Sequence, residues 1–245
     1  MSGDAVVIAL LAVLAGSMVK SISGMGLPLI AVPAITFVAD VETAVAVIAI
    51  PNLCINAAMA WRARDTAPDT RDLPMLGATG FIGGIIGTFA LVSWREEPLV
   101  AILVAVVAIY VLTYVRSPDF GIGPTTSRRF APLVGTCAGL LQGAIGISGP
   151  IVGSWIHSYR LHRRAHIFSV TTMFTLAGVS QLATLLLRGD LDGRWTVAVL
   201  GCVPALGTVP LGERLRDRFS SEGFDRFIVA TITVTITALA IRTFV

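Results

Sequence analysis

The chain has 245 residues, of which 55% are hydrophobic and 13% are charged. Soluble domains carry about 25% charged residues, so this composition is that of an integral membrane protein and excludes a separate soluble domain of ordinary size. The net charge is +3, and the arginines form short clusters between apolar segments without interleaved aromatic residues. This pattern excludes a nucleic-acid surface and indicates signals of membrane topology.

The first apolar segment is predicted to be interrupted. Residues 5–19 are apolar, residues 20–28 break the run, and a second apolar piece continues through Ala39. The break carries Lys20, the only lysine of the chain, followed by two glycines and Pro28. Glycine relaxes the backbone and proline forbids a continuous helical hydrogen-bond ladder. The second piece is also shorter than the roughly 20 residues of a full span, so the sequence predicts two half-helices.

Three complete spans are predicted to follow, at residues 43–61, 75–94 and 98–115. The second of these contains the GxxxG spacings Gly80/Gly84 and Gly83/Gly87, which predict close contact with another helix. The longest polar connector comes next, and we expect it to join two halves of the protein.

The second half repeats this order of elements. Its apolar segment covers residues 131–147, its break lies at residues 146–150, and a short piece runs to Tyr159. Spans follow at about 167–187, 195–212 and 226–244. Residues 24–28 align without a gap with residues 146–150, and Lys20 aligns with Gln142. The sequence therefore predicts a first transmembrane repeat (1–115), a cytoplasmic connector (116–130) and a second transmembrane repeat (131–245).

Charge placement predicts that the two repeats are inverted. We count each broken element as two arms, which either cross the membrane twice or form a re-entrant hairpin. Then 13 of the 18 lysine and arginine residues lie on one side, in residues 61–73, 116–130, 160–166 and 213–226. Single crossings would divide them almost evenly and violate the positive-inside rule. The predicted fold is all-α, with two inverted repeats that each contain a broken or re-entrant first helix pair and three transmembrane helices. Both termini are then predicted to face away from the cytoplasm.

The two breaks predict an anion site. Half-helices that begin near Leu27 and Pro150 present unpaired N–H groups and the positive ends of their dipoles. Two such ends that meet near the membrane midplane bind an anion, as in other transporters with broken helices. Glycines allow close backbone approach, and lysine, serine, asparagine and glutamine side chains add donors. The candidate substrate-binding residues are Lys20, Ser21, Ser23, Gly24, Gly26, Asn52, Gln142, Gly146, Ser148 and Gly149.

Each candidate also has a purely structural interpretation. The side chain of Lys20 can extend to the lipid headgroups, and the glycines can serve helix packing alone. Polar residues on the next spans either line the cavity or form hydrogen bonds between helices; these are Asn52, Asn56, Thr171, Thr172 and Gln181. The recurrence of the same pattern in both halves favours the anion site.

Other titratable groups suggest no coupled chemistry. All 15 acidic residues lie at segment ends or in loops, so a carboxylate proton relay is missing, and the three histidines flank a basic cluster near water. The cysteines lie apart in apolar segments, without the spacing of a metal or redox site.

Asp4 places negative charge where a signal peptide is positive, so we expect the N-terminus to remain uncleaved. With the cell interior negative, anion export is favourable by about 2.3 kcal/mol per charge per 100 mV, and export or facilitated passage needs no coupling ion.

The arrangement resembles the sulfite exporter TauE/SafE family, also called TSUP, over nearly the whole chain. The matching residues are Gly24, Met25, Gly26, Pro28 and Pro33 in the first half, and Gly139, Gly143, Gly146, Gly149 and Pro150 in the second. Family members typically have three consecutive glycines where Met25 separates two here. The resemblance implies a secondary transporter of sulfite, sulfonates or related small anions in the bacterial inner membrane. We therefore expect a multi-pass protein of the cell membrane, with no enzymatic activity, cofactor, metal or nucleic-acid partner.

Two other functions compete with transport as interpretations of the sequence. Residues 146–149 fit the G-x-S-G pattern around the nucleophile of an intramembrane serine protease, which would use Ser148. That chemistry requires a histidine from another span, whereas all three histidines follow Ser148 within 20 residues and none lies in a later span. A glycine-packed scaffold without a ligand would leave the lysine in the apolar break unexplained.

Overall fold

The structure is a computed structural model, and it describes residues 3–116 and 121–216. Every regular element in this part of the chain is a helix. Five of the described helices, counting α9 and α10 as one, are long and apolar enough to cross a membrane. The elements are α1 (Gly3–Ser23), α2 (Leu27–Thr36), α3 (Val41–Arg62), the 3₁₀ helix η1 (Arg64–Asp69), α4 (Leu73–Ser93), α5 (Glu96–Arg116), α6 (Pro124–Ile145), α7 (Gly149–His157), α8 (Arg163–Arg188), α9 (Trp195–Leu200) and α10 (Cys202–Arg216).

Two helix boundaries differ from the sequence-based expectation. Helix α6 begins at Pro124, inside the predicted connector, because proline is well suited to the first turn of a helix and has no N–H group to leave unpaired there. The span expected at 195–212 is divided at Gly201, where a Cβ atom would lie only 2.8 Å from Pro51 Cγ of α3. The span expected at 226–244 lies outside the described residues.

Both predicted helix breaks are present, and they have the same form. Helix α1 ends at Ser23 and α2 begins at Leu27, while α6 ends at Ile145 and α7 begins at Gly149. Each linker contains a glycine in the left-handed region, with φ of 88° at Gly24 and 71° at Gly146. Each following helix has a proline in its first turn. Helices α2 and α7 have 10 and 9 residues, so each is about 15 Å long, half the hydrocarbon thickness of a bilayer.

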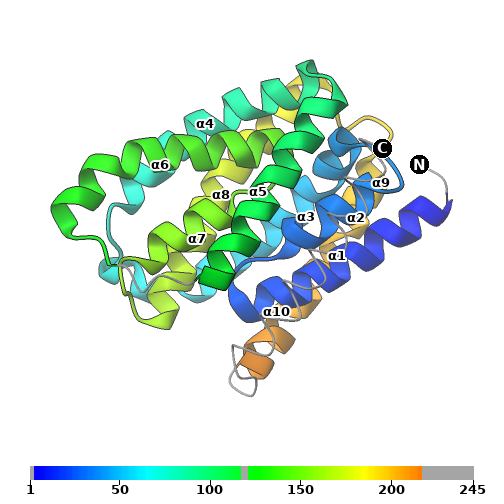
Figure 1. Cartoon of the computed structure of the whole chain (residues 1–245). Helices are drawn as coiled ribbons and strands as arrows, with labels where there is room; N and C mark the ends of the chain where they lie inside the picture. The colour runs from blue at the N-terminus through cyan, green and yellow to red at the C-terminus, as the bar shows by residue number, and fades with distance from the viewer. Residues whose placement is uncertain (1–2, 117–120, 217–245) are drawn as a thin grey trace.

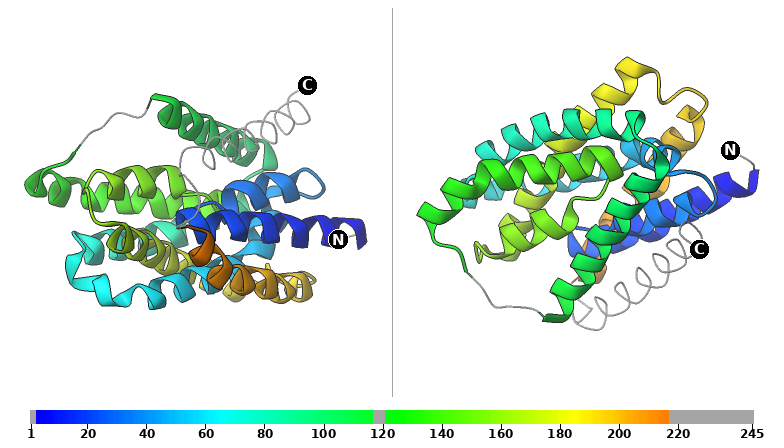
Figure 2. Two further views of the ribbon diagram at one scale, coloured as in Figure 1. Left: turned by 90° about the horizontal axis from the view of Figure 1, so that it is seen from below. Right: turned by 45° about the horizontal axis from the view of Figure 1, so that its top comes forward.

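Helices α4 and α6 pack backbone to backbone. The Gly83/Gly87 spacing of α4 faces α6, whereas the Gly80/Gly84 spacing makes room for side chains of α8. A Cβ atom on Gly83 or Gly87 would collide with the backbone of α6, and one on Gly139 would collide with the backbone of α4. Figures 1 and 2 show the two helices side by side along most of their lengths. Small residues allow such close contact between membrane helices, where apolar side chains give no preference for protein over lipid.

The remaining helices bring both breaks into one bundle. Helix α1 packs against α2 and α10, and α3 packs against α2, α8 and α10 (Figures 1 and 2). Side chains from α1, α2 and α3 form most of the larger buried cluster, and residues of α6, α7 and α8 form most of a second one. Helices α3 and α8 thus run through the centre of the described structure, where the two breaks approach each other.

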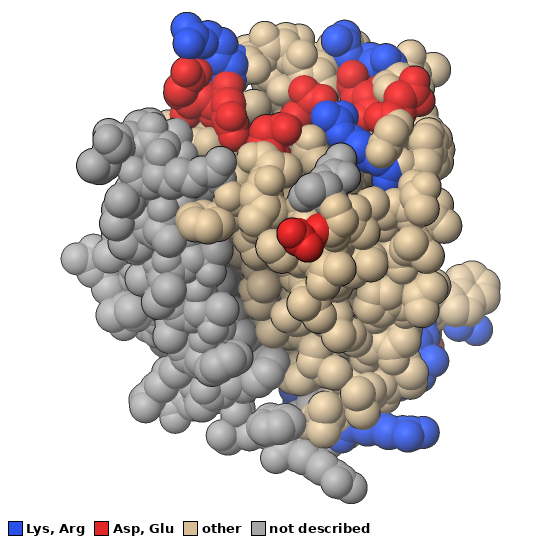
Figure 3. Space-filling model, turned by 90° about the vertical axis from the view of Figure 1, so that its right-hand side faces the viewer, with Lys and Arg blue, Asp and Glu red and all other residues tan. Residues whose placement is uncertain are grey.

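Charged side chains gather at the two ends of the bundle. Figure 3 shows basic residues at both edges of one face, acidic residues at the upper edge, and a broad band between them that is almost free of charge. At one end Arg62 pairs with Glu213, Arg164 with Asp65 and His162 with Asp69, so the ends of α3, α8 and α10 lie together. At the other end Arg194 pairs with Glu42.

The connector before α6 reaches the same end as η1 and the start of α8. Arg71 Nη2 donates to the carbonyl oxygen of Ile122 at 2.9 Å, and Ser127 Oγ donates to Asp72 Oδ2 at 2.6 Å. Arg71 also stacks on Tyr159, and burial, followed by the nearby charge of Asp72, raises the pKa of Tyr159 to about 12. The described portions of all four arginine-rich segments that the sequence placed on one side therefore meet at one end of the molecule.

Candidate anion site at the two helix breaks

A small cavity lies between the two breaks. It has a volume of about 10 Å³ and is lined by both linkers, by the first turns of α2 and α7, and by side chains of α1, α3, α6 and α8. The lining residues are Lys20, Met25, Gly26, Pro28, Leu29, Asn52, Gln142, Ile147, Ser148, Gly149 and Phe174. The first turns of two helices, with their unpaired N–H groups, thus face one space.

Lys20 lies inside the protein at the end of α1. Its side chain is only 1% exposed, and its Nζ lies 4.7 Å from the centroid of the Phe174 ring. It therefore does not extend along the surface toward the lipid headgroups. No ion pair among the described residues includes Lys20. The cation–π contact offsets only part of the free energy that is lost when an ammonium group leaves water.

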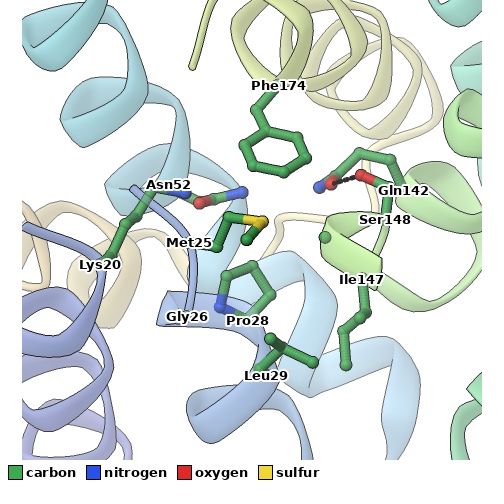
Figure 4. A pocket seen from close by; sticks show the side chains of 11 residues that line it. Lys20, Met25, Gly26, Pro28, Leu29, Asn52, Gln142, Ile147, Ser148 and Phe174 are labelled. Atoms are coloured by element: carbon green, nitrogen blue, oxygen red, sulfur yellow. Dashed lines mark hydrogen bonds between the residues drawn. The ribbon is translucent and has the colours of Figure 1, made fainter. Parts of the chain in front are cut away.

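A hydrogen-bonded chain forms the opposite wall of the cavity. Ser148 Oγ donates to Gln142 Oε1 at 2.9 Å, and Gln142 Nε2 donates to Gln181 Oε1 at 3.3 Å. Gln181 Nε2 in turn donates to the main-chain oxygen of Gln142 at 2.7 Å. Figure 4 shows Gln142 and Ser148 on one side of the cavity and Lys20 and Asn52 on the other. The chain holds the amide of Gln142 in one orientation.

The first break is held by local hydrogen bonds. Gly24 N donates to Lys20 O at 2.7 Å and closes the last turn of α1. Ser23 Oγ donates to the main-chain oxygens of Val19 and Met25, at 3.0 and 2.5 Å, and accepts from Met25 N at 3.2 Å. These bonds fix the backbone at Met25, whose side chain lies in the middle of the cavity in Figure 4. They also show that Ser23 shapes the linker rather than lining the cavity.

The structure brings together six of the ten residues that the sequence singled out. Lys20, Gly26, Asn52, Gln142, Ser148 and Gly149 line the cavity. Ser21, Ser23, Gly24 and Gly146 do not line it. Ser21 shares a hydrogen bond of 3.2 Å with Thr208 of α10, and Gly24 and Gly146 supply the left-handed turns of the linkers.

Some of the polar residues on α3 and α8 line the cavity, and others form hydrogen bonds between or within helices. Asn52 lines the cavity and accepts a hydrogen bond of 3.2 Å from Asn56, while Gln181 forms bonds between helices. Thr171 donates to Ile167 O within its own helix at 2.7 Å. Phe174 and Met25 line the cavity but were not anticipated. The spacing of Phe174, one turn after Thr171 on the same helix face, was the available signal.

A model of the sulfite exporter TauE/SafE family matches residues 8–239. The chain belongs to the sulfite exporter TauE/SafE family. The match includes both helix breaks and all of the described helices from α2 to α10. No curated protein and no solved structure matches the chain. Family membership and the apolar helices together identify a transmembrane protein of the sulfite-exporter type.

The surroundings of Ser148 in this TauE/SafE protein give the protease alternative no support. The Ser148 hydroxyl donates to an amide oxygen, which cannot accept its proton as a general base would. His162 pairs with Asp69 at the arginine-rich end, and His157 and His166 face each other with ring centroids 6.3 Å apart. His157 is at the end of α7 opposite to Ser148, about 13 Å away along the helix axis.

Proposed function

We propose that this protein is a secondary transporter, exporter or facilitator, of small sulfur-containing or organic anions such as sulfite and sulfonates. The anion would bind between the two helix breaks, in contact with Lys20, the first turns of α2 and α7, and the side chains of Asn52 and Ser148. The observation that carries this proposal is a buried lysine, without a described carboxylate partner, beside two helix N-termini. An anion would supply the missing negative charge and accept hydrogen bonds from the N–H groups.

We further propose that the fold consists of two inverted repeats in the cell membrane. The matching form of the two breaks supports a repeat, since Gly24 and Pro28 correspond to Gly146 and Pro150 in both sequence and structure. The common location of the arginine-rich segments supports the inversion, and by the positive-inside rule that end would face the cytoplasm. Each half-helix would then reach the midplane from its own side of the bilayer.

The size of the cavity implies that side chains must move before an anion binds. A volume of about 10 Å³ is close to the minimum that one water molecule needs, and an oxyanion with three oxygens is larger. Met25 is the side chain best placed to move, because it lies at the centre of the cavity and an unbranched thioether changes rotamer easily. The small volume supports the view that this structure would be a closed form of the proposed transporter.

The experiment is a measurement of sulfite binding and uptake with the whole protein. Purified protein is heated with sulfite, sulfate, thiosulfate, sulfoacetate or acetate, and a bound anion at 100 times its Kd stabilises by about 2.7 kcal/mol. For a chain of this size that corresponds to a rise in Tm of roughly 5–10 °C. Labelled sulfite should also enter inverted vesicles that contain the protein and not empty ones. Absence of both effects for every sulfur-containing anion would exclude the proposed substrate class.

A further inference from the structure

A polar cluster fastens the outer end of α7 to the start of α4. Tyr159, two residues beyond the end of α7, donates from its hydroxyl to Asp72 Oδ2 at 3.3 Å and accepts from Trp155 Nε1 at 2.7 Å. The guanidinium group of Arg71 lies 4.1 Å from the centroid of the Tyr159 ring. Ser127 of α6 also donates to Asp72 Oδ2, at 2.6 Å. We call Arg71, Asp72, Ser127, Trp155 and Tyr159 the tyrosine clamp.

The hydroxyl of Tyr159 remains a donor in this cluster. Burial, followed by the nearby charge of Asp72, raises the pKa of Tyr159 to about 12, so the phenol keeps its proton at neutral pH. Hydrogen bonds to a carboxylate are stronger than those between neutral groups. The tyrosine clamp therefore holds the end of α7 against the starts of α4 and α6.

The connector between the two halves of the chain passes through the tyrosine clamp. Ile122 N donates to Ser158 O at 3.2 Å, and Ile122 O accepts from Arg71 Nη2 at 2.9 Å. The side chain of Arg160 covers the same segment, since a Cβ atom on Gly121 would lie 3.1 Å from Arg160 Nε. A movement of the outer end of α7 would therefore break contacts with both α4 and the connector.

The backbone on both sides of the tyrosine clamp is strained. Among the described residues, Asp72 and Arg160 are the two non-glycine residues with positive φ, at 56° and 53°. Each directly follows a clamp residue that stacks in the Arg71–Tyr159 pair. Arg71 Nε is also buried without a hydrogen-bond partner among the described residues. Such strained positions persist only where surrounding contacts hold them, and they are common in segments that switch between two arrangements.

An apolar contact between α7 and α8 fills the space from the tyrosine clamp to the cavity at the breaks. Val152 and Ile156 of α7 pack with Val170 of α8 in one buried cluster. Tyr159 lies at one end of this cluster, and Phe174, which lines the cavity, also belongs to it. While α7 stays on α8, this contact closes the cavity from the arginine-rich end.

The tyrosine clamp is not repeated in the same form at the other end of the bundle. The spacing that aligns residue 24 with residue 146 also aligns the start of α4 with the start of α9. It pairs Arg71 with Gly193, which has no side chain, and Asp72 with Arg194. Arg194 forms an ion pair with Glu42 of α3 at 3.0 Å. The two ends are thus held by different interactions, and each can be broken separately.

We propose that the tyrosine clamp is the lock of a gate at the arginine-rich end of the protein. While the clamp is intact, α7 stays on α8 and the cavity at the breaks is closed from that side. When Tyr159 separates from Asp72 and Arg71, the outer end of α7 swings away from α4 and α6, turning on the linker at Gly146, and opens the cavity. This proposal rests on the proposed function, because it describes how access to the same anion site is controlled.

The test measures how often α7 leaves α8, with a thiol reagent that cannot cross the membrane. Ile156→Cys is the reporter, because Ile156 is only 1% exposed and lies in the contact between α7 and α8. It is introduced into the full-length protein after Cys54, Cys137 and Cys202 have been changed to alanine. Inverted vesicles expose the arginine-rich side under the proposed topology, and the rate of modification is measured in them.

Loss of the tyrosine clamp should expose the reporter. Tyr159→Phe removes the hydroxyl and keeps the ring, and it should raise the rate of modification roughly tenfold, because a hydrogen bond to a charged group is lost. Asp72→Ala should also raise the rate. The two changes together should raise it by less than the product of their separate effects, because both remove the same hydrogen bond.

Two controls separate an opened gate from general loosening of the protein. Glu42→Gln breaks the ion pair at the other end and should leave the rate at Ile156→Cys unchanged. Ile35→Cys, buried in the last turn of α2, is probed from the opposite side in right-side-out vesicles, and Tyr159→Phe should not raise its rate. Val152→Cys, one turn earlier on α7, replaces the reporter if Ile156→Cys disturbs folding.

The labelling result is independent of the substrate. An unchanged rate in both clamp variants, or an equal increase at Ile35→Cys, would overturn the gate even if sulfite uptake is intact. A reporter that is exposed as expected in a protein that transports no sulfur-containing anion would support the gate and overturn the proposed substrate instead.

Discussion

Replacement of Lys20 by methionine separates a functional lysine from a structural one. The side chain is 1% exposed and pairs with no described carboxylate, so its charge lowers the stability of the protein without an anion. Methionine has a similar length and no charge. Replacing buried ionic groups with apolar ones of similar volume often stabilises proteins by about 1–4 kcal/mol. Lys20→Met should therefore raise Tm by at least about 2 °C in the absence of substrate.

The same change should remove most of the affinity for an anion. Two unit charges 4 Å apart interact by about 4 kcal/mol at the effective dielectric constant of a protein site. Each 1.36 kcal/mol is a factor of ten, so Kd for sulfite should rise about a thousandfold. Thermal shifts with sulfite and uptake into inverted vesicles measure the two effects. Arg95→Gln is the matched control, because the Arg95 side chain is 84% exposed and lies at the other end of α4 and α5 from the arginine-rich segments.

We expect Lys20→Met to give a stabilised protein that no longer binds sulfite. Lys20→Met with the Kd and uptake rate of the unchanged protein would show that Lys20 takes no part in anion binding. A fall in Tm together with lost uptake would show that the lysine is needed for folding, and the cation–π contact with Phe174 would then be its main role.

Three further predictions concern the linker, the packing and the topology. Met25→Ala should lower stability by about 2 kcal/mol and increase the uptake of larger sulfonates relative to sulfite, because the Met25 side chain fills the cavity and covers Gly153 of α7; unchanged selectivity would mean that Met25 does not limit substrate size. Gly139→Val should lower stability by about 1–3 kcal/mol through collision with α4, whereas Gly207→Ala, with no atom of the described residues within 4 Å of its added Cβ, should cost nothing in the same melting assay. Impermeant thiol reagents should label Thr126→Cys and Arg160→Cys from one side of the membrane and Glu96→Cys from the other; labelling of all three from one side would contradict the proposed topology.

The helix breaks were predictable from sequence because their causes are local. A left-handed glycine in the linker and a proline at the second residue of the next helix interrupt the helical hydrogen bonds independently of the surrounding structure. The ungapped match of residues 24–28 with residues 146–150 then located both breaks in the sequence. The close packing of α4 was also predictable, since GxxxG spacing places glycines on one helix face. The start of α6 at Pro124 was harder to place, because it lies inside a charged connector and is marked only by a proline in the first turn.

The composition of the site was only partly predictable. Lys20 and Gln142 were found because polar side chains next to a break are rare in apolar segments. Ser21 was included by its chemistry alone, and only the structure shows that it points to α10 and binds Thr208. The spacing from Thr171 places Phe174 on the same face of its helix, but only the packing of α3 against α8 shows that this face meets the cavity.

The contact between α4 and α6 would constrain how the proposed transporter alternates its access between the two sides of the bilayer. Helix α4 comes from the first half of the chain and α6 from the second, and their main chains are in direct contact at Gly83, Gly87, Gly139 and Gly143. If the first half of the chain rocked against the second, the contact between α4 and α6 would separate and expose peptide groups to hydrocarbon. We therefore expect α4 and α6 to remain a fixed frame, while α2 and α7 tilt on their three-residue linkers to admit and release the solute.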